Sequence, residues 1–152
     1  MTNISKYITL KEYVPSGHPE ISNFEVKEEK VNIDQNNDIL IQNEWISVDP
    51  YMRARMTERK NYKPPFQINK PMEGAAIGKV IESNSSKFSK DDVVISDYGW
   101  RDNYLANDSD IVKIKPIDVP LQTYLGPLGM TGQTAYIGLF KIGKLKKNQT
   151  II

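Results

Sequence analysis

The side chains that most often carry out chemistry are scarce in this sequence. It contains no cysteine and a single histidine, His18, in the turn-forming stretch 14–19. Without cysteine the chain has no disulfide, iron–sulfur cluster, thiol nucleophile or thiolate zinc site. No G-x-S-x-G motif accompanies His18, and zinc sites built on imidazole commonly use two or three histidines. We therefore interpret His18 as a solvated loop residue, and most hydrolytic and metal chemistry is excluded.

The composition and charge of the chain also limit which binding partners are expected. The 152 residues are 39% hydrophobic and 26% charged, and the formal net charge is +1. This length suits one globular domain with a core, and the charge balance gives no general attraction to nucleic acid or anionic lipid. The sequence has no apolar run of about 18 residues, and its start lacks the basic and apolar regions of a signal peptide. We therefore expect no nucleic-acid partner, no membrane association and a cytoplasmic location.

The elements that position any site are mostly β-strands. Short strands are expected where β-branched and aromatic residues recur between turn-forming stretches, over residues 4–14, 24–31, 39–48, 75–82, 93–96 and 111–114. A short helix is expected over 51–59, with Asp49 as its N-cap and Pro50 at its first helical position. Residues 60–71 hold three prolines and predict a loop. This pattern predicts a mainly β fold with a few helices, a small barrel or sandwich.

The last third of the chain changes character. Apolar residues recur between 119 and 142 at a spacing that suits two helical segments, and the glycines predict a break between Gly129 and Gly132. A lysine-rich turn and a short apolar segment from Thr150 follow, which we interpret as the start of a strand that is cut off. We therefore expect a barrel over 1–120 and a helical connection over 121–152.

Three segments resemble the zinc-free medium-chain dehydrogenase/reductase family. Residues 47–56, SVDPYMRARM, are similar to its V-D-P-Y-M-R signature. Residues 72–83, MEGAAIGKVIES, match a second family segment, and 128–139, LGMTGQTAYIGL, are close to G-M-P-G-L-T-A-Y-x-G-L. The order and spacing of all three match, and the resemblance covers nearly the whole chain. The branch it indicates contains the prostaglandin/leukotriene reductases and the NADP-dependent enone, or double-bond, reductases.

The resemblance implies a GroES-like, partly open β-barrel followed by a Rossmann domain. No G-x-G-x-x-G follows a strand here, so NADP(H) is expected to be bound mainly by the missing domain, through which relatives also form homodimers. The implied activity is NADP(H)-dependent reduction of the C=C bond of α,β-unsaturated ketones or aldehydes, with this fragment inactive alone. Two alternatives stay open: a quinone reductase of the same family, and a non-catalytic barrel that binds a small ligand or protein.

The resemblance also places candidate site residues. The zinc-ligand positions of metal-dependent relatives fall on Asp49, Met72 and Met130, and a carboxylate with two thioethers does not suit zinc. Glu73, beside Met72, matches an acidic neighbour that structural hydrogen bonding explains. We therefore expect no metal.

Tyr51 is the first choice for a catalytic and substrate-binding side chain. It falls close to where zinc relatives carry a proton-relay hydroxyl, and plant double-bond reductases use the matching tyrosine in the substrate pocket. A phenol can donate to a carbonyl or enolate oxygen while its ring lines an apolar cavity. The alternative is that Tyr51 only caps the barrel.

The remaining candidates divide between substrate and cofactor. Thr134 matches a residue whose hydroxyl meets the nicotinamide region, and Met130 and Gly132 would border the same site, with packing as the alternative for Met130. Arg55 is a candidate for an anionic substrate tail, as is Arg53, although a solvated or ion-paired helix face is the simpler interpretation of both. Trp100 is a candidate for pocket lining, with barrel packing as its default role.

One position departs from the family pattern. Asp91 stands where relatives have a glycine in a Gly-Asp turn. Aspartate tolerates a left-handed backbone better than most residues, so we expect a local cost in stability and no effect on activity.

Overall fold

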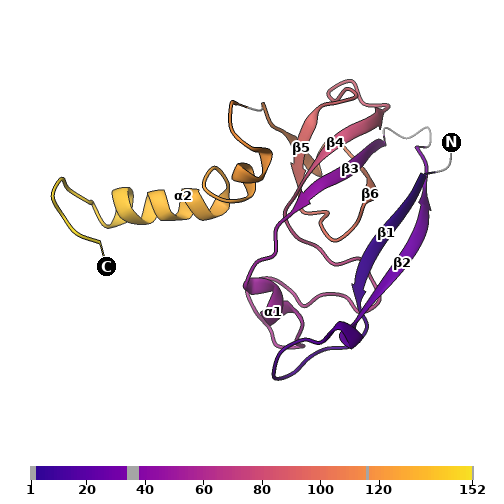
Figure 1. Cartoon of the computed structure of the whole chain (residues 1–152), viewed down its shortest axis with the longest axis horizontal. Coiled ribbons are helices and arrows are strands. Elements are labelled where there is room, and N and C mark those ends of the chain that lie inside the picture. Colours follow the sequence, from indigo (N-terminus) through magenta and orange to yellow (C-terminus); the bar gives the residue numbers. More distant parts are fainter. Residues whose placement is uncertain (1–2, 34–37, 116, 152) are drawn as a thin grey trace. The chain divides into compact units, whose positions relative to one another are not determined.

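The computed structural model describes residues 3–33, 38–115 and 117–151, and it is mainly β (Figure 1). The chain divides into two compact units, Met1–Pro116 and Ile117–Ile152, which are described separately below. Every named strand lies in the first unit. The expected mainly β class is therefore confirmed. None of the helices in the described ranges has the length and hydrophobicity needed to cross a bilayer.

Two antiparallel sheets build the first unit. Strands β1 (Asn3–Leu10) and β2 (Phe24–Val31) form a two-stranded sheet, visible at the right of Figure 1. The larger sheet has the strand order β6-β3-β4-β5-β7, and its strands are β3 (Ile39–Ile46), β4 (Ala76–Ser83), β5 (Val93–Ser96), β6 (Asn103–Ala106) and β7 (Ile111–Lys113). Strands β6 and β7 are its two edges, so the sheet stays open as the predicted partly open barrel requires.

The strand predictions follow the structure closely, with one omission. The ranges 24–31 and 93–96 coincide with β2 and β5, and the other four overlap their strands with shifted ends. Strand β6 was not predicted, because its four residues begin inside the turn-like segment Arg101-Asp102-Asn103 and its strand partner is β3 alone. Asp91 has φ 71°, which confirms the left-handed backbone expected there.

Each sheet has its own hydrophobic core. The five-stranded sheet packs a cluster that contains Ile39, Ile41, Val80, Phe88, Val94, Tyr104, Ala106 and Ile111. A second cluster, which we call the α1 cluster, contains Leu10, Met52, Met56, Phe66 and Met72. The helix α1 (Tyr51–Arg55) contributes Met52 to it, and the residue after α1 contributes Met56. The site residues of the first unit border this second cluster.

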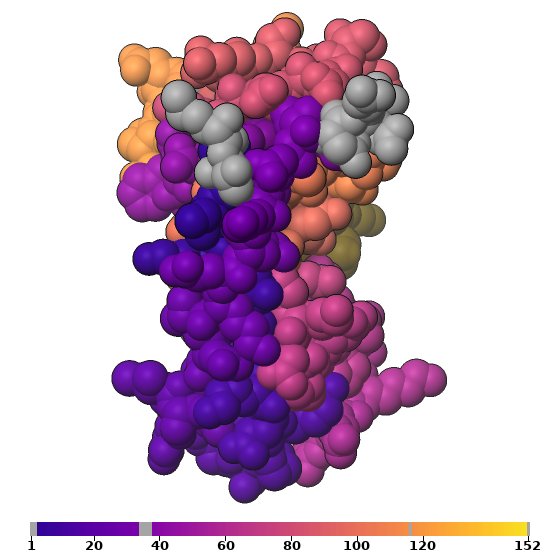
Figure 2. Space-filling model, turned by 90° about the vertical axis from the view of Figure 1, so that its right-hand side faces the viewer, coloured from indigo at the N-terminus to yellow at the C-terminus, as the bar shows by residue number. Residues whose placement is uncertain are grey.

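The helix α1 is shorter than predicted. It ends at Arg55 rather than Arg59, and Pro50 is its N-cap residue rather than its first helical residue. Asp49 contributes only its carbonyl, which accepts from the Met52 amide at 3.0 Å, because no side-chain cap is made. The predicted loop over 60–71 is confirmed, and it lies along β1: Asn69 N donates to Leu10 O, and Met72 N donates to Ile8 O. Figure 2 shows this pink segment beside the indigo and purple β1–β2 sheet.

The second unit is helical and has no buried residue in any of its helices. It contains a 3₁₀ helix (Leu121–Leu125), the helix α2 (Met130–Tyr136) and a π-helix (Ile137–Ile142). The break falls between Leu125 and Met130, so the predicted position was wrong for Gly132, which lies inside α2. A Cβ on Gly132 would overlap the Pro127 carbonyl, so this glycine serves a close backbone approach rather than a chain break.

The different burial of two valines on neighbouring strands predicts different effects on stability. Val94 is fully buried in the core of the larger sheet, whereas Val112, on the neighbouring strand β7, is 63% exposed. Val94→Ala should lower the free energy of unfolding by about 2 kcal/mol, since two methyl groups are lost and a cavity is left. Val112→Ala makes the same chemical change and should cost less than about 1 kcal/mol, the β-propensity difference alone. Urea denaturation of both variants checks this, and equal losses would contradict the assigned core.

Candidate functional site

Three chain segments meet at the start of α1 through a close approach of their backbones. Ser47 N donates to Ala75 O at 2.8 Å, Gly74 N donates to Asp97 O at 2.9 Å, and Gly99 N donates to Gly74 O at 2.9 Å. A Cβ on Gly74 would lie 2.6 Å from the Met52 methyl group, and one on Gly99 would lie 2.8 Å from Gly74 O. Gly99 is therefore required by space, because the clash is with backbone, whereas a side chain at Gly74 would require the end of the Met52 side chain to move.

Tyr51 opens α1 and lies half-buried at the margin of the α1 cluster. Its ring centroid is 6.4 Å from that of Tyr62 and 5.3 Å from the Lys63 ammonium. No group in the described part of the chain accepts a hydrogen bond from its hydroxyl. Burial and then the negative charges of Asp49 and Asp97 raise the pKa of Tyr51 above its usual value of 10. The hydroxyl therefore stays protonated at neutral pH and is free to donate.

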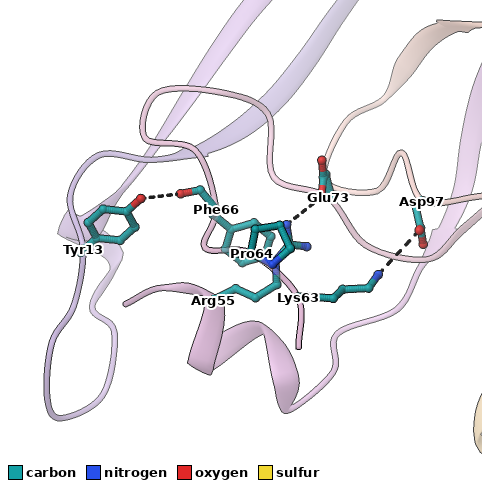
Figure 3. Close-up of polar contacts among 7 residues, drawn as sticks. All are labelled: Tyr13, Arg55, Lys63, Pro64, Phe66, Glu73 and Asp97. Atoms are coloured by element: carbon teal, nitrogen blue, oxygen red, sulfur yellow. Dashed lines mark hydrogen bonds and ion pairs between the residues drawn. The ribbon is translucent and has the colours of Figure 1, made fainter. Parts of the chain in front are cut away.

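Arg55 lies at the other end of α1 and is 4% exposed (Figure 3). Its Nε donates to Pro64 O at 2.8 Å, its Nη2 pairs with Glu73 at 2.7 Å, and its Cζ lies 4.1 Å from the Phe66 ring centroid. Its own carbonyl accepts from Phe66 N at 2.8 Å. The expected ion pair of Arg55 is thus present, but the side chain is not solvated. The guanidinium holds the loop 60–71 against α1.

The same loop brings two residues that sequence reasoning missed. Tyr62 and Lys63 both contact the Tyr51 ring, and Lys63 also pairs with Asp97 at 3.7 Å (Figure 3). The loop is proline-rich and has no periodic pattern, so no signal in the sequence pointed to these contacts. They place an aromatic edge and a cation over the face of the candidate phenol.

Trp100 is partly buried and packs against the α1 cluster. It adopts φ 58°, a left-handed backbone that is unusual for a bulky residue. Its indole Nε1 is buried and has no hydrogen-bond partner in the described residues, and it lies 3.5 Å from where a Gly74 Cβ would be. The ring also lines a groove of about 350 Å³ together with Ile8 and Trp45. Trp100 thus both packs against the α1 cluster and lines this groove, and its part in substrate binding stays a prediction.

Asp49 and Met72, which match zinc-ligand positions of metal-dependent relatives, belong to this unit. Met72 is 1% exposed inside the α1 cluster, where its thioether packs against apolar side chains. Glu73, next to it, pairs with Arg55, which is the structural role expected for it. Within the described ranges no three His, Cys, Asp or Glu side chains gather to hold a metal ion.

The cofactor-side candidates lie in the second unit. Thr134 Oγ1 donates to Met130 O at 2.7 Å within α2, so the hydroxyl retains only its acceptor capacity. The Met130 side chain is exposed, and Gly132 packs its backbone against Pro127. The three candidates thus occupy one helix; Thr134 is explained locally by its bond to Met130 O and Gly132 by backbone packing, whereas the exposed Met130 side chain does not show the packing role given as its alternative. Their contact with a nicotinamide stays a prediction.

Comparison with known proteins gives one family. A model described as the N-terminal domain of oxidoreductase matches residues 6–114. The NADPH-dependent curcumin reductase of Escherichia coli (strain K12) is 36% identical over 138 residues, which are 91% of this chain and 40% of that protein. The 2-alkenal reductase (NADP(+)-dependent) of Nicotiana tabacum is 36% identical over 152 residues, 97% of this chain and 44% of that protein.

A solved structure agrees with these matches. CurA from Vibrio vulnificus in complex with NADPH superimposes with a TM-score of 0.81 at 32% sequence identity, covering 93% of this chain and 42% of that one. The chain therefore spans less than half the length of the relatives it matches.

The two arginines of α1 provide a matched stability test. Arg55→Met removes a buried charge together with its bonds to Pro64 and Glu73, and should lower the free energy of unfolding by about 2–3 kcal/mol because the Pro64 carbonyl is left unpaired. Arg53→Met loses only hydrogen bonds from an exposed guanidinium to Gly17 O, at 2.9 and 3.1 Å, and should cost less than about 1 kcal/mol. Thermal or urea unfolding compares the two, and an equal cost would show that the Arg55 contacts do not stabilise the loop.

Proposed function

Because the chain belongs to the family of oxidoreductase N-terminal domains, we propose that it forms the substrate-side domain of an NADP(H)-dependent oxidoreductase. The proposed reaction is zinc-independent reduction of the C=C bond of α,β-unsaturated ketones or aldehydes. The relative from Nicotiana tabacum is a 2-alkenal reductase, and a 2-alkenal is an α,β-unsaturated aldehyde. The similarity supports the same substrate class here.

The observation that carries the proposal is the Tyr51 hydroxyl. It is protonated at neutral pH, it has no acceptor in the described part of the chain, and it lies beside an apolar cluster. The bound cofactor supplies the hydride to the β-carbon of the substrate. Negative charge then develops on the carbonyl oxygen, and a neutral phenol donating to that oxygen stabilises the enolate. No Lewis acid is needed at that oxygen.

Arg55 acts as a positioning residue in this proposal. Its side chain is buried and its charge is paired with Glu73, so it holds the loop that carries Tyr62 and Lys63 over the phenol. In this proposal the substrate is bound by Tyr51 and by the aromatic surface of Trp100, which lines the groove of about 350 Å³.

The nicotinamide end of NADP(H) would meet α2 in this proposal. Thr134 offers an acceptor lone pair, which suits the amide N–H groups of a carboxamide, and Met130 and Gly132 flank it. The pyrophosphate needs backbone N–H groups at a glycine-rich turn, and this sequence contains no G-x-G-x-x-G after a strand. The main grip on the cofactor therefore lies outside this chain.

The activity is tested with a full-length protein that contains this domain. NADPH should be consumed in the presence of a medium-chain enone, with the saturated ketone as product. Consumption with quinones alone would establish the alternative quinone reductase, and no turnover with either class would overturn the proposal.

Tyr51→Phe tests the phenol in the same full-length protein. The value of kcat/KM for the enone should fall by about 10²-fold, because one hydrogen bond to the developing oxyanion is lost. Tyr13→Phe is the control, since the Tyr13 hydroxyl donates to Phe66 O at 3.0 Å and serves only the packing of the same cluster. It should lower stability by about 1 kcal/mol and leave kcat/KM unchanged. A Tyr51→Phe variant with full activity would leave the enolate without its proposed donor.

A further inference from the structure

A groove of about 670 Å³ runs past the end of α1, and its charged lining residues are all basic. Arg53, Arg59 and Lys60 supply the charge, and Pro15, Pro50 and Asn61 are among the other residues that line it. No acidic side chain lines the groove, although Glu58 directly precedes Arg59 in the sequence. Its volume falls within the range of sites for small molecules.

The three cations are uncompensated. Six lysines of the first unit pair with carboxylates, as Lys63 does with Asp97 and Lys87 with Asp108, whereas Lys11, Lys30, Lys70 and Lys90 are in none of the ion pairs of the described ranges. None of the ion pairs found in the described ranges includes Arg53, Arg59 or Lys60. Three positive charges around one groove repel one another. Because the net charge of the whole chain is only +1, the positive charge at this groove is a local feature.

Part of this basic surface is held in place. Arg53 donates from Nε and Nη2 to Gly17 O at 3.1 and 2.9 Å, which fixes the guanidinium and leaves Nη1 with no bond in the described part of the chain. Prolines 15 and 50 form rigid walls, and Thr57 Oγ1 donates to Ala54 O at 2.8 Å to hold the turn after α1. A fixed guanidinium loses less entropy when it binds an anion.

We propose that this groove is a binding site for a small anion that carries a phosphate or carboxylate group. Charge-assisted hydrogen bonds from two guanidinium groups and one ammonium group suit such a ligand. Pro50, which lines the groove, directly precedes Tyr51. In the reductase proposed above, the anion is the charged end of the substrate, and only this choice of ligand depends on the proposed function.

The site is tested by calorimetric titration of the 152-residue chain with inorganic pyrophosphate at low salt. The double variant Arg59→Gln/Lys60→Gln should bind at least about tenfold more weakly, because two charge-assisted contacts are lost. The control Lys146→Gln/Lys147→Gln removes the same two charges from the second unit and should change the affinity by less than about twofold. Equal weakening in both variants, or no binding by the unaltered chain, would overturn the proposal.

A second arm identifies the source of the anion. The chain is titrated with an enone that carries a terminal carboxylate and with its methyl ester. Tighter binding of the carboxylate, lost in Arg59→Gln/Lys60→Gln, supports a substrate tail, whereas a groove that binds pyrophosphate and does not distinguish acid from ester is a site for a free anion. Tighter, salt-sensitive binding of a single-stranded oligonucleotide would overturn the small-anion assignment. Reduction of an uncharged enone by the full-length protein does not depend on this groove, so failure of one proposal leaves the other standing.

Discussion

The arrangement of the candidate site depends on the contacts of the buried Arg55 guanidinium. A charge removed from water is costly unless it is paired and hydrogen-bonded, and Arg55 meets this requirement through Pro64, Glu73 and the Phe66 ring. These three partners come from one loop and from the segment that follows it. Satisfying a single side chain therefore fixes the course of the whole loop 60–71, for which the sequence supplies no helix or strand pattern.

The hydrogen bonding of these buried side chains is incomplete. Arg55 Nη1 and Trp100 Nε1 are both buried donors without partners in the described ranges. An unpaired buried donor costs roughly 1–3 kcal/mol, so a fold selected for stability alone would remove it. Both side chains border the apolar cluster that Tyr51 also contacts. Asn43 Oδ1, on β3 of the larger sheet, is a third buried polar atom without a partner in the described ranges, so such atoms are not confined to the surroundings of Tyr51.

Sequence reasoning anticipated the parts of the fold that rest on local patterns. Alternating β-branched residues predicted β2 and β5 to the residue, and the Asp91 turn followed from one departure in a known motif. It failed where tertiary packing decides the outcome. Arg53 and Arg55 are indistinguishable by type, yet the first is half-buried and the second fully buried, because only Arg55 lies against Phe66. The contacts of Tyr62 and Lys63 with Tyr51 depend in the same way on the path of a loop.

In the proposed reaction, the Tyr51 phenol would serve where zinc-dependent enzymes use a metal ion. A carbonyl reduced directly places a full negative charge on oxygen, whereas hydride addition to a conjugated C=C bond delocalises that charge over an enolate. A neutral hydrogen-bond donor can stabilise this delocalised charge, provided that the donor does not ionise. Burial and the neighbouring carboxylates Asp49 and Asp97 raise the pKa of Tyr51 and so keep the proton on the hydroxyl, at the expense of its acidity. In the proposed reaction, the neutral Tyr51 phenol donates a hydrogen bond to the developing enolate oxygen.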